Sequence, residues 1–154
     1  MPTSSSRTAS CSERRRILFV ANETLASDLV VGLVERHASE ADVLVVAPAL
    51  QGRLAFWTSA EAAPRRAAEA RLARCLALLR EAGVAAEGLV GDADPLLAIE
   101  DALRLFAADE IVIATHPERR SNWLARNIVR RAGERFWHPI HHVVVETQPA
   151  RVAA

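Results

Sequence analysis

The stretch between residues 91 and 114 constrains the fold of this chain more than any other segment. It begins with Gly91 and continues with an apolar pattern at helical spacing. That pattern opens on Asp94 and Pro95, which are a favoured helix N-cap and a favoured first helical residue. A short turn then leads into the apolar run at residues 110–114. The segment therefore predicts a strand exit, a capped amphipathic helix, a turn and a buried strand, which is half of a doubly wound α/β domain.

The rest of the chain repeats this alternation. Short runs rich in Val, Ile and Leu predict the strands, of which those at residues 17–21 and 42–47 are expected to be buried and that at 84–90 has a weaker pattern, and apolar residues spaced three and four apart predict the helices between them. We expect strands at residues 17–21, 42–47, 84–90, 110–114 and 140–146, and helices at 25–37, from 63 to just before Gly83, at 95–106 and at 122–136. Because strands and helices alternate, the sequence predicts a doubly wound, five-stranded parallel sheet of the Rossmann-like type in a three-layer α/β/α domain.

Length and composition are those of one soluble domain. A chain of 154 residues is long enough to bury ~68–70% of its unfolded surface. No apolar run approaches the roughly 18 residues that indicate a membrane helix. We expect a Ser-rich disordered tail at residues 1–14, the α/β domain at 15–147 and a C-terminal tail at 148–154.

Charge and cysteine content exclude several classes of function. The net charge is zero, so the chain has no overall basic field for nucleic acid, and we expect neither nucleic acid nor a membrane as a partner. All 19 basic residues are arginine, which rules out lysine-based chemistry such as a Schiff base. Cys11 and Cys75 have neither disulfide-framework nor metal-ligand spacing, which favours a reducing compartment, the cytoplasm.

Three loops are expected to meet at the carboxyl edge of the sheet, where ligands bind in folds of this class. The candidate nucleotide- or anion-binding residues in these loops are Asn22, Glu23, Thr24, Gly91, Asp92, Thr115, His116, Arg119, Arg120, Ser121 and Asn122. The carboxylates of Asp92 and Asp94 would oppose a polyphosphate, and their simpler role is to cap the helix that follows.

The loop after residue 115 permits two interpretations. Arg119 and Arg120 precede an expected helix start that Ser121 or Asn122 can cap, and guanidinium groups at such a place match phosphate or carboxylate. The alternative is a solvated turn in which one arginine pairs with Glu118.

The histidines and tryptophans give weaker signals. His116 has no nucleophile or carboxylate that the sequence places within reach, so we expect it to hydrogen-bond loop backbone and assign no catalytic residue. His141 and His142 are neighbours on a strand and point to opposite faces, so they cannot easily share a metal ion, and we assign no metal site. Trp123 and Trp137 are expected to be packing residues.

The order and spacing of these residues resemble those of the universal stress protein family. The matching positions are Gly91-Asp92, Asp94-Pro95, Ile99, Ala102, residues 108–112, residues 17–24, Thr115-His116 and Pro139. The resemblance covers about residues 16–146. It implies a UspA-like domain with an adenine nucleotide alpha hydrolase-like fold, with ATP or another adenine nucleotide as the candidate ligand. It also implies a homodimer formed through the last strand at Val143, Val144 and Val145.

The glycine-rich ATP motif of that family is absent from this chain. Many members carry Gly-x-x-Gly, nine residues and Gly-Ser/Thr after the fourth strand, where glycines bring free N–H groups close to the phosphates. Here Ala114 and Pro117 take the first two glycine positions, residues 126–128 contain no Gly-Ser, and Asn22 replaces the acidic residue of the first turn. We therefore expect a non-catalytic stress-response module with no resident cofactor, whose degenerate pocket binds a nucleotide or small anion weakly.

Two alternatives remain open. One is a nucleotide-binding protein or ATPase of the same fold, which would need a Gly-rich loop or His-x-Gly-His after the first strand, and residues 22–24 supply neither. The other is a protein-interaction module that acts as a homodimer and whose pocket is vestigial.

Overall fold

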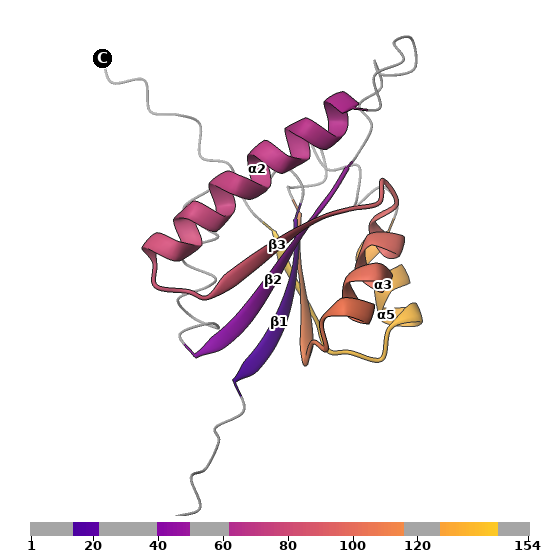
Figure 1. Cartoon of the computed structure of the whole chain (residues 1–154). Coiled ribbons are helices and arrows are strands. Elements are labelled where there is room, and N and C mark those ends of the chain that lie inside the picture. The colour runs from indigo at the N-terminus through magenta and orange to yellow at the C-terminus, as the bar shows by residue number, and fades with distance from the viewer. Residues whose placement is uncertain (1–13, 22–39, 50–61, 116–126, 145–154) are drawn as a thin grey trace, which may run out of the picture.

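The computed structural model describes residues 14–21, 40–49, 62–115 and 127–144, in which a sheet is covered by helices on both faces (Figure 1). The strands are β1 (Arg15–Ala21), β2 (Ala41–Pro48), β3 (Ala86–Gly91), β4 (Glu110–Thr115) and β5 (Ile140–Val144), and the helices are α2 (Ala62–Glu81), α3 (Pro95–Leu105) and α5 (Ile128–Arg135). The helix expected at residues 25–37 and the tails expected at 1–14 and 148–154 lie outside the described residues, apart from Arg14. None of the described helices is long and apolar enough to span a bilayer.

The sheet has five strands in the order β3-β2-β1-β4-β5, and every neighbouring pair is parallel. The chain runs outward from β1 to β3, returns to place β4 on the other side of β1, and ends at β5. This confirms the predicted doubly wound parallel sheet. The direction of winding reverses between β1 and β4, where Ala21 lies opposite Ala114. The carboxyl ends of these two strands therefore form the topological switch point at which ligands bind in such folds.

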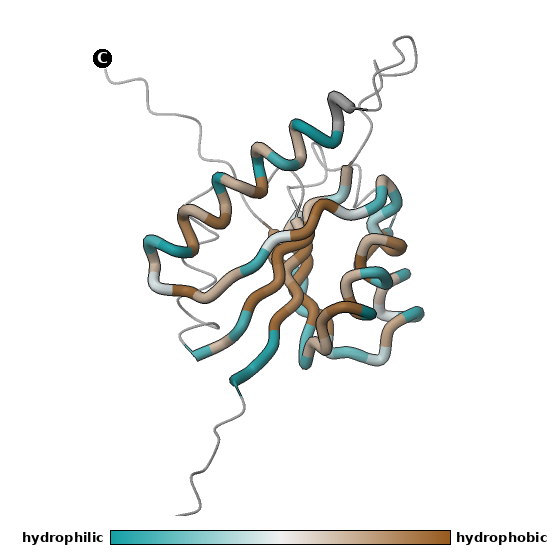
Figure 2. Tube along the Cα trace, viewed as in Figure 1, coloured by the Kyte–Doolittle hydropathy of each residue, from teal (hydrophilic) through white to brown (hydrophobic). Residues whose placement is uncertain are grey.

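The three central strands, β2, β1 and β4, are largely apolar on both faces because both of their faces are covered (Figure 2). Side chains such as Ile17 and Phe19 belong to the core between the sheet and α2. Their neighbours Leu18 and Val20 belong to the core between the sheet and the pair α3 and α5. Successive residues of a strand thus serve opposite layers, which explains why the strands read as continuous apolar runs rather than alternating ones.

Helix α2 packs one apolar stripe on the sheet and ends in the way the sequence predicts. Leu72 and Leu79 are buried on this stripe, and Leu76 packs against the same core. Gly83 has φ 78, its N–H donates to the Arg80 carbonyl at 3.0 Å, and the N–H of Val84 donates to the Leu79 carbonyl at 2.9 Å. These two bonds form a Schellman motif with Gly83 as the C′ residue.

This helix end also corrects the predicted start of the third strand. We expected the strand to begin at Val84, but β3 begins at Ala86. Because the Val84 N–H closes the Schellman motif, it is not available to a strand ladder. The strand therefore starts two residues later than its apolar sequence indicates.

Helix α3 begins as predicted at Asp94 and Pro95. Asp94 is the N-cap, its Oδ1 accepts a hydrogen bond from the Leu96 N–H at 2.9 Å, and Pro95 fills the first helical position. Leu96 and Ile99 are buried against the sheet, and Leu103 and Phe106 pack partly buried on the same core.

The predicted helix at 122–136 is interrupted at Asn127, and its residues 122–126 lie outside the described residues. The described helix, α5, begins at Ile128, and the residue before it, Asn127, has φ 49 and ψ 42. This left-handed conformation cannot continue a right-handed helix, so no uninterrupted helix runs from Asn122 to Phe136. Asn is one of the few residues besides Gly that adopts this conformation readily, and the apolar pattern alone did not reveal it.

Candidate functional site

The candidate site is the carboxyl edge of the sheet, and the structure describes three of the residues predicted for it: Gly91, Asp92 and Thr115. Gly91 ends β3 and Thr115 ends β4. The other eight candidate residues lie outside the described residues, namely Asn22, Glu23, Thr24, His116, Arg119, Arg120, Ser121 and Asn122.

Gly91 is required by packing. A Cβ built on this residue would lie 2.5 Å from the Ala98 Cβ and 3.2 Å from the Val46 Cγ1. The first distance is far below van der Waals contact, so any side chain at this position would push α3 away from the end of β3. The glycine thus brings α3 close to the sheet beside the candidate site.

Asp92 and Asp94 shape the turn that enters α3. The Asp92 Oδ1 accepts a hydrogen bond from the Asp94 N–H at 2.8 Å, and the Asp94 Oδ1 accepts from the Leu96 N–H. Both carboxylates are therefore engaged with backbone donors at the helix start, where negative charge is favourable. This confirms the predicted capping role for Asp94, whereas Asp92 accepts from the N–H of the N-cap residue itself.

Thr115 makes a side-chain contact that the sequence did not reveal. Its side chain is fully buried, and its Oγ1 lies 2.7 Å from the Nε2 of His142 on β5. From the sequence, His142 was considered as a metal ligand, and no metal site was assigned to it. The contact arises because β5 lies beside β4, which places residues 27 positions apart in the chain next to each other at the carboxyl edge.

The start of α5 carries a second feature that bears on anion binding. Asn127, the N-cap residue, makes no side-chain hydrogen bond to the helix. Asn127 therefore gives the first N–H groups of α5 no side-chain cap, and N–H groups at a helix start attract anions. Asn127 falls within residues 126–128, where the resemblance places the last glycine of the ATP motif, and it adopts the left-handed backbone that glycine favours. Ala114, at the first glycine position, is instead buried in the core facing α2.

The two neighbouring histidines of β5 serve opposite faces of the sheet, as predicted. His141 Nε2 lies 3.0 Å from Glu110 Oε2 on the face that packs against α2, whereas His142 faces Thr115 on the other side. Arg15 Nη2 lies 3.0 Å from the same Glu110 oxygen. Only 3% of the Glu110 side chain is exposed, so Arg15 offsets the charge of a buried carboxylate at the amino edge, and the His141 ring contacts the same oxygen.

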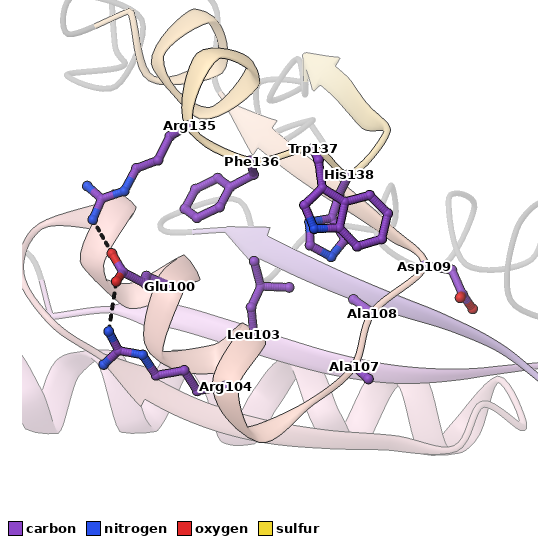
Figure 3. A pocket seen from close by; sticks show the side chains of 10 residues that line it. All are labelled: Glu100, Leu103, Arg104, Ala107, Ala108, Asp109, Arg135, Phe136, Trp137 and His138. Carbon is purple, nitrogen blue, oxygen red and sulfur yellow. Dashed lines mark hydrogen bonds and ion pairs between the residues drawn. The ribbon is translucent and has the colours of Figure 1, made fainter.

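A pocket of about 580 Å³ lies near the opposite, amino edge of the sheet, between the ends of α3 and α5 (Figure 3). Its lining is Glu100, Leu103, Arg104, Ala107, Ala108, Asp109, Arg135, Phe136, Trp137 and His138. At one end Glu100 lies between two guanidinium groups, those of Arg104 and Arg135, and pairs with both. These ion pairs join α3 to α5 and place cations in the last turns of both helices, where they are favourable.

The expectation that Trp137 is a packing residue is wrong. Its side chain is 84% exposed, and its ring stacks on His138 with the centroids 4.1 Å apart (Figure 3). The reason is that α5 ends at Arg135, so Trp137 lies beyond the buried stripe of Ile128 and Ala132. A tryptophan this exposed beside a pocket is typical of a contact surface.

Solved structures of universal stress proteins are similar to this fold. A universal stress family protein from Burkholderia pseudomallei superimposes with a TM-score of 0.58 at 18% identity, over 83% of this chain and 94% of that chain. A universal stress protein from Archaeoglobus fulgidus in complex with dAMP gives 0.56 at 20% identity, over 84% and 97%. A family member from Arabidopsis thaliana with AMP bound gives 0.57 at 12% identity, over 89% and 97%.

The sequence itself matches no protein-family model and no curated protein. The structural likeness nevertheless extends over most of this chain and nearly all of each solved structure. The chain therefore has the UspA-like α/β fold of the universal stress proteins, as the resemblance in the sequence implied.

Proposed function

We propose that this protein is a non-catalytic binding module of the universal stress type, which holds an adenine nucleotide or another small anion weakly at the carboxyl edge. One observation carries the proposal. Asn127 adopts left-handed backbone directly before α5 and gives that helix no side-chain cap, in the stretch where the resemblance places the last glycine of the ATP motif. The backbone conformation that glycine would supply at this position is thus present although the glycine is not. The solved neighbours with AMP and dAMP bound support a ligand of this class.

Binding is expected to be weak because the glycine positions have changed. Ala114 points into the core, and Pro117 has no N–H to donate to a phosphate. The carboxylates of Asp92 and Asp94 accept hydrogen bonds from backbone N–H groups. They add negative charge near the carboxyl edge of the sheet, and this charge opposes the binding of a phosphate. The cytoplasm, where adenine nucleotides are abundant, is the proposed location.

Native mass spectrometry of small molecules retained after purification, followed by calorimetric titration with AMP, ADP, ATP and cyclic AMP, tests the proposal. We expect at least one of these to bind with a dissociation constant in the range from about 10 μM to 1 mM, which corresponds to roughly −7 to −4 kcal/mol. Tightly retained ATP with its phosphates on the loop after Thr115 would contradict the degenerate pocket. No binding of any of the four would contradict the binding function.

Absence of catalysis is part of the proposal and has its own test. No group of three or more His, Cys, Asp or Glu side chains that could hold a metal ion occurs among the described residues. We expect no ATP hydrolysis above the buffer rate. Turnover that is lost in His116→Ala would instead establish an ATPase of the same fold, since His116 follows the strand that ends at the candidate site.

We also propose that the protein is a homodimer through β5. This strand is at the edge of the sheet, and Val144 is 48% exposed, whereas Val145 lies outside the described residues. An exposed edge strand of this composition has unpaired backbone N–H and C=O groups that can pair with a second strand. Pairing between two copies of the chain satisfies these groups on both edge strands.

A second candidate function, protein interaction without a nucleotide, is favoured by Trp137. Its exposed ring and the pocket beside it offer an aromatic anchor and an apolar depression, which are the parts of interfaces that contribute most to binding. A photo-crosslinking amino acid that replaces Trp137 should then trap one defined partner in cells. The same amino acid in place of Arg74, on α2, should trap none. Equal labelling at both positions would contradict this function.

A further inference from the structure

The pair formed by Thr115 and His142 fixes the position of a proton at the carboxyl edge. Thr115 is opposite Val144 in the β4–β5 register, and His142 is opposite Ile113. Because Thr115 lies two residues farther along its strand than Ile113, the His142 ring must lean toward the carboxyl edge to place its Nε2 2.7 Å from the Thr115 Oγ1. The ring is therefore directed toward the candidate site.

The buried hydroxyl favours one of the two neutral forms of His142. Among the described residues, His142 Nε2 is the one side-chain hydrogen-bond partner of the Thr115 Oγ1. A buried O–H without an acceptor costs about 1–3 kcal/mol, which favours donation from the hydroxyl to Nε2. A nitrogen that accepts carries no hydrogen, and a neutral imidazole then has its proton on Nδ1.

The Nδ1–H group produced in this way is available to a ligand. His142 is exposed on the edge strand, and within the described part of the chain no group is bonded to its Nδ1. The carboxylates of Asp92 and Asp94 are bonded to backbone N–H groups next to β3, and β2, β1 and β4 separate them from β5. Asp92 and Asp94 therefore do not compete with a ligand for the Nδ1–H group of His142.

We propose that His142 presents its Nδ1–H as a hydrogen-bond donor to the phosphate of the ligand, and that Thr115 is a positioning residue that holds the ring in this tautomer. The proposal rests on the proposed function, because it assigns a specific donor to the anion at the carboxyl edge. A fixed donor on β5 compensates in part for the N–H groups that the missing glycines would have supplied.

The tautomer is measurable without a ligand. Nitrogen-detected NMR of the free protein at a pH above the titration range of histidine should show His142 with a protonated Nδ1 and an unprotonated Nε2. In Thr115→Val, which keeps the shape and removes the hydroxyl, the ring should become a mixture of tautomers. Thr115→Ser should restore the single form. A wild-type ring protonated on Nε2 would overturn the role of Thr115.

Binding of AMP and of adenosine tests the ligand contact. His142→Gln places an amide near the Nε2 position, where it can still accept from Thr115, but it has no donor at the Nδ1 position. We expect its affinity for AMP to fall about tenfold and its affinity for adenosine, which has no phosphate, to stay unchanged. His142→Asn places an N–H near the Nδ1 position and should recover most of the loss. His141→Gln, on the other face of the sheet, is the matched control.

The outcomes separate the two proposals. If wild type binds AMP and His142→Gln binds it equally well, the role of His142 is overturned and the proposed function stands. If wild type binds none of the adenine nucleotides, the proposed function is overturned and the ligand contact with it, while the NMR result still decides the role of Thr115. Circular dichroism of each variant establishes that a lost affinity is not a lost fold.

Discussion

Gly91 and Ala98 lie so close together that a methyl group on the glycine would stand 2.5 Å from the Ala98 Cβ. This contact between the end of β3 and the first turns of α3 sets how closely the helix approaches the sheet beside the candidate site. The glycine therefore has a packing role that is independent of any ligand.

Gly91→Ala should destabilise the fold. The new methyl group must displace Ala98, which belongs to a buried helix face, and overpacking of this kind costs about 1–3 kcal/mol. Gly133→Ala is the matched control, because a methyl group added there would meet nothing within 4 Å and alanine favours a helix over glycine by about 0.5–1 kcal/mol. Urea unfolding should show opposite signs for the two variants. A Gly91→Ala variant as stable as wild type would contradict the packing role.

Arg15→Met should cost more stability than Glu110→Gln. Removal of the cation leaves a buried carboxylate beside His141 without its arginine partner, at a cost of about 1–3 kcal/mol, whereas the amide variant removes the buried charge itself. With Glu110→Gln already present, adding Arg15→Met should cost little more. Free energies of unfolding for the four proteins of this cycle test the order. The reverse order would mean that the carboxylate is not balanced by Arg15.

Burial raises the pKa of the Cys75 thiol from its ordinary 9.0 to about 11, because the thiolate is desolvated in the core beneath α2. As the pH rises from 9 to about 11, the unfolded state loses the thiol proton while the folded state keeps it. The unfolded state then binds fewer protons, so the free energy of unfolding should fall with rising pH in this window.

The composition makes this pH dependence easy to assign. The chain has no Tyr, and all of its basic side chains are Arg, so cysteines are the only side chains that titrate between pH 9 and about 11. Cys75→Ala should lose the slope and Cys11→Ser should keep it, as followed by chemical unfolding at a series of pH values. A slope that persists in Cys75→Ala would contradict the assignment.

Val144→Lys should convert the proposed homodimer to a monomer. Val144 is 48% exposed on the edge strand, and a charged side chain on such a strand opposes strand pairing. Leu97→Lys is the control, since Leu97 is 41% exposed on α3, away from the edge. Sedimentation velocity should give twice the 16.8 kDa chain mass for wild type and for the control. A wild-type monomer would rule out the dimer.

The sequence was sufficient for the fold because its signals are local. The central strands β1, β2 and β4 are short, largely apolar runs, Gly83 ends α2, and Asp94 with Pro95 starts α3, and all of these are read from neighbouring residues. The parallel arrangement followed from the alternation of these elements.

The candidate site was harder to predict because its contacts join distant residues. The Thr115–His142 pair depends on β5 lying beside β4 in one particular register, which no local pattern specifies. The start of α5 was missed because Asn127 has a polar side chain that is equally compatible with a helix surface. The exposure of Trp137 depends on where α5 ends. Because the predicted bounds of this helix were wrong, the predicted burial of Trp137 was wrong as well.

Asn127 makes this fold a practical starting point for redesign. Asn127, directly before α5, holds a left-handed backbone conformation that most residues avoid. That conformation is already present at position 127, so a change to glycine alters only a side chain and leaves the route of the backbone intact. Laboratory selection for tighter nucleotide binding should therefore yield Asn127→Gly early. A scaffold without this backbone conformation would need a new loop instead of one substitution.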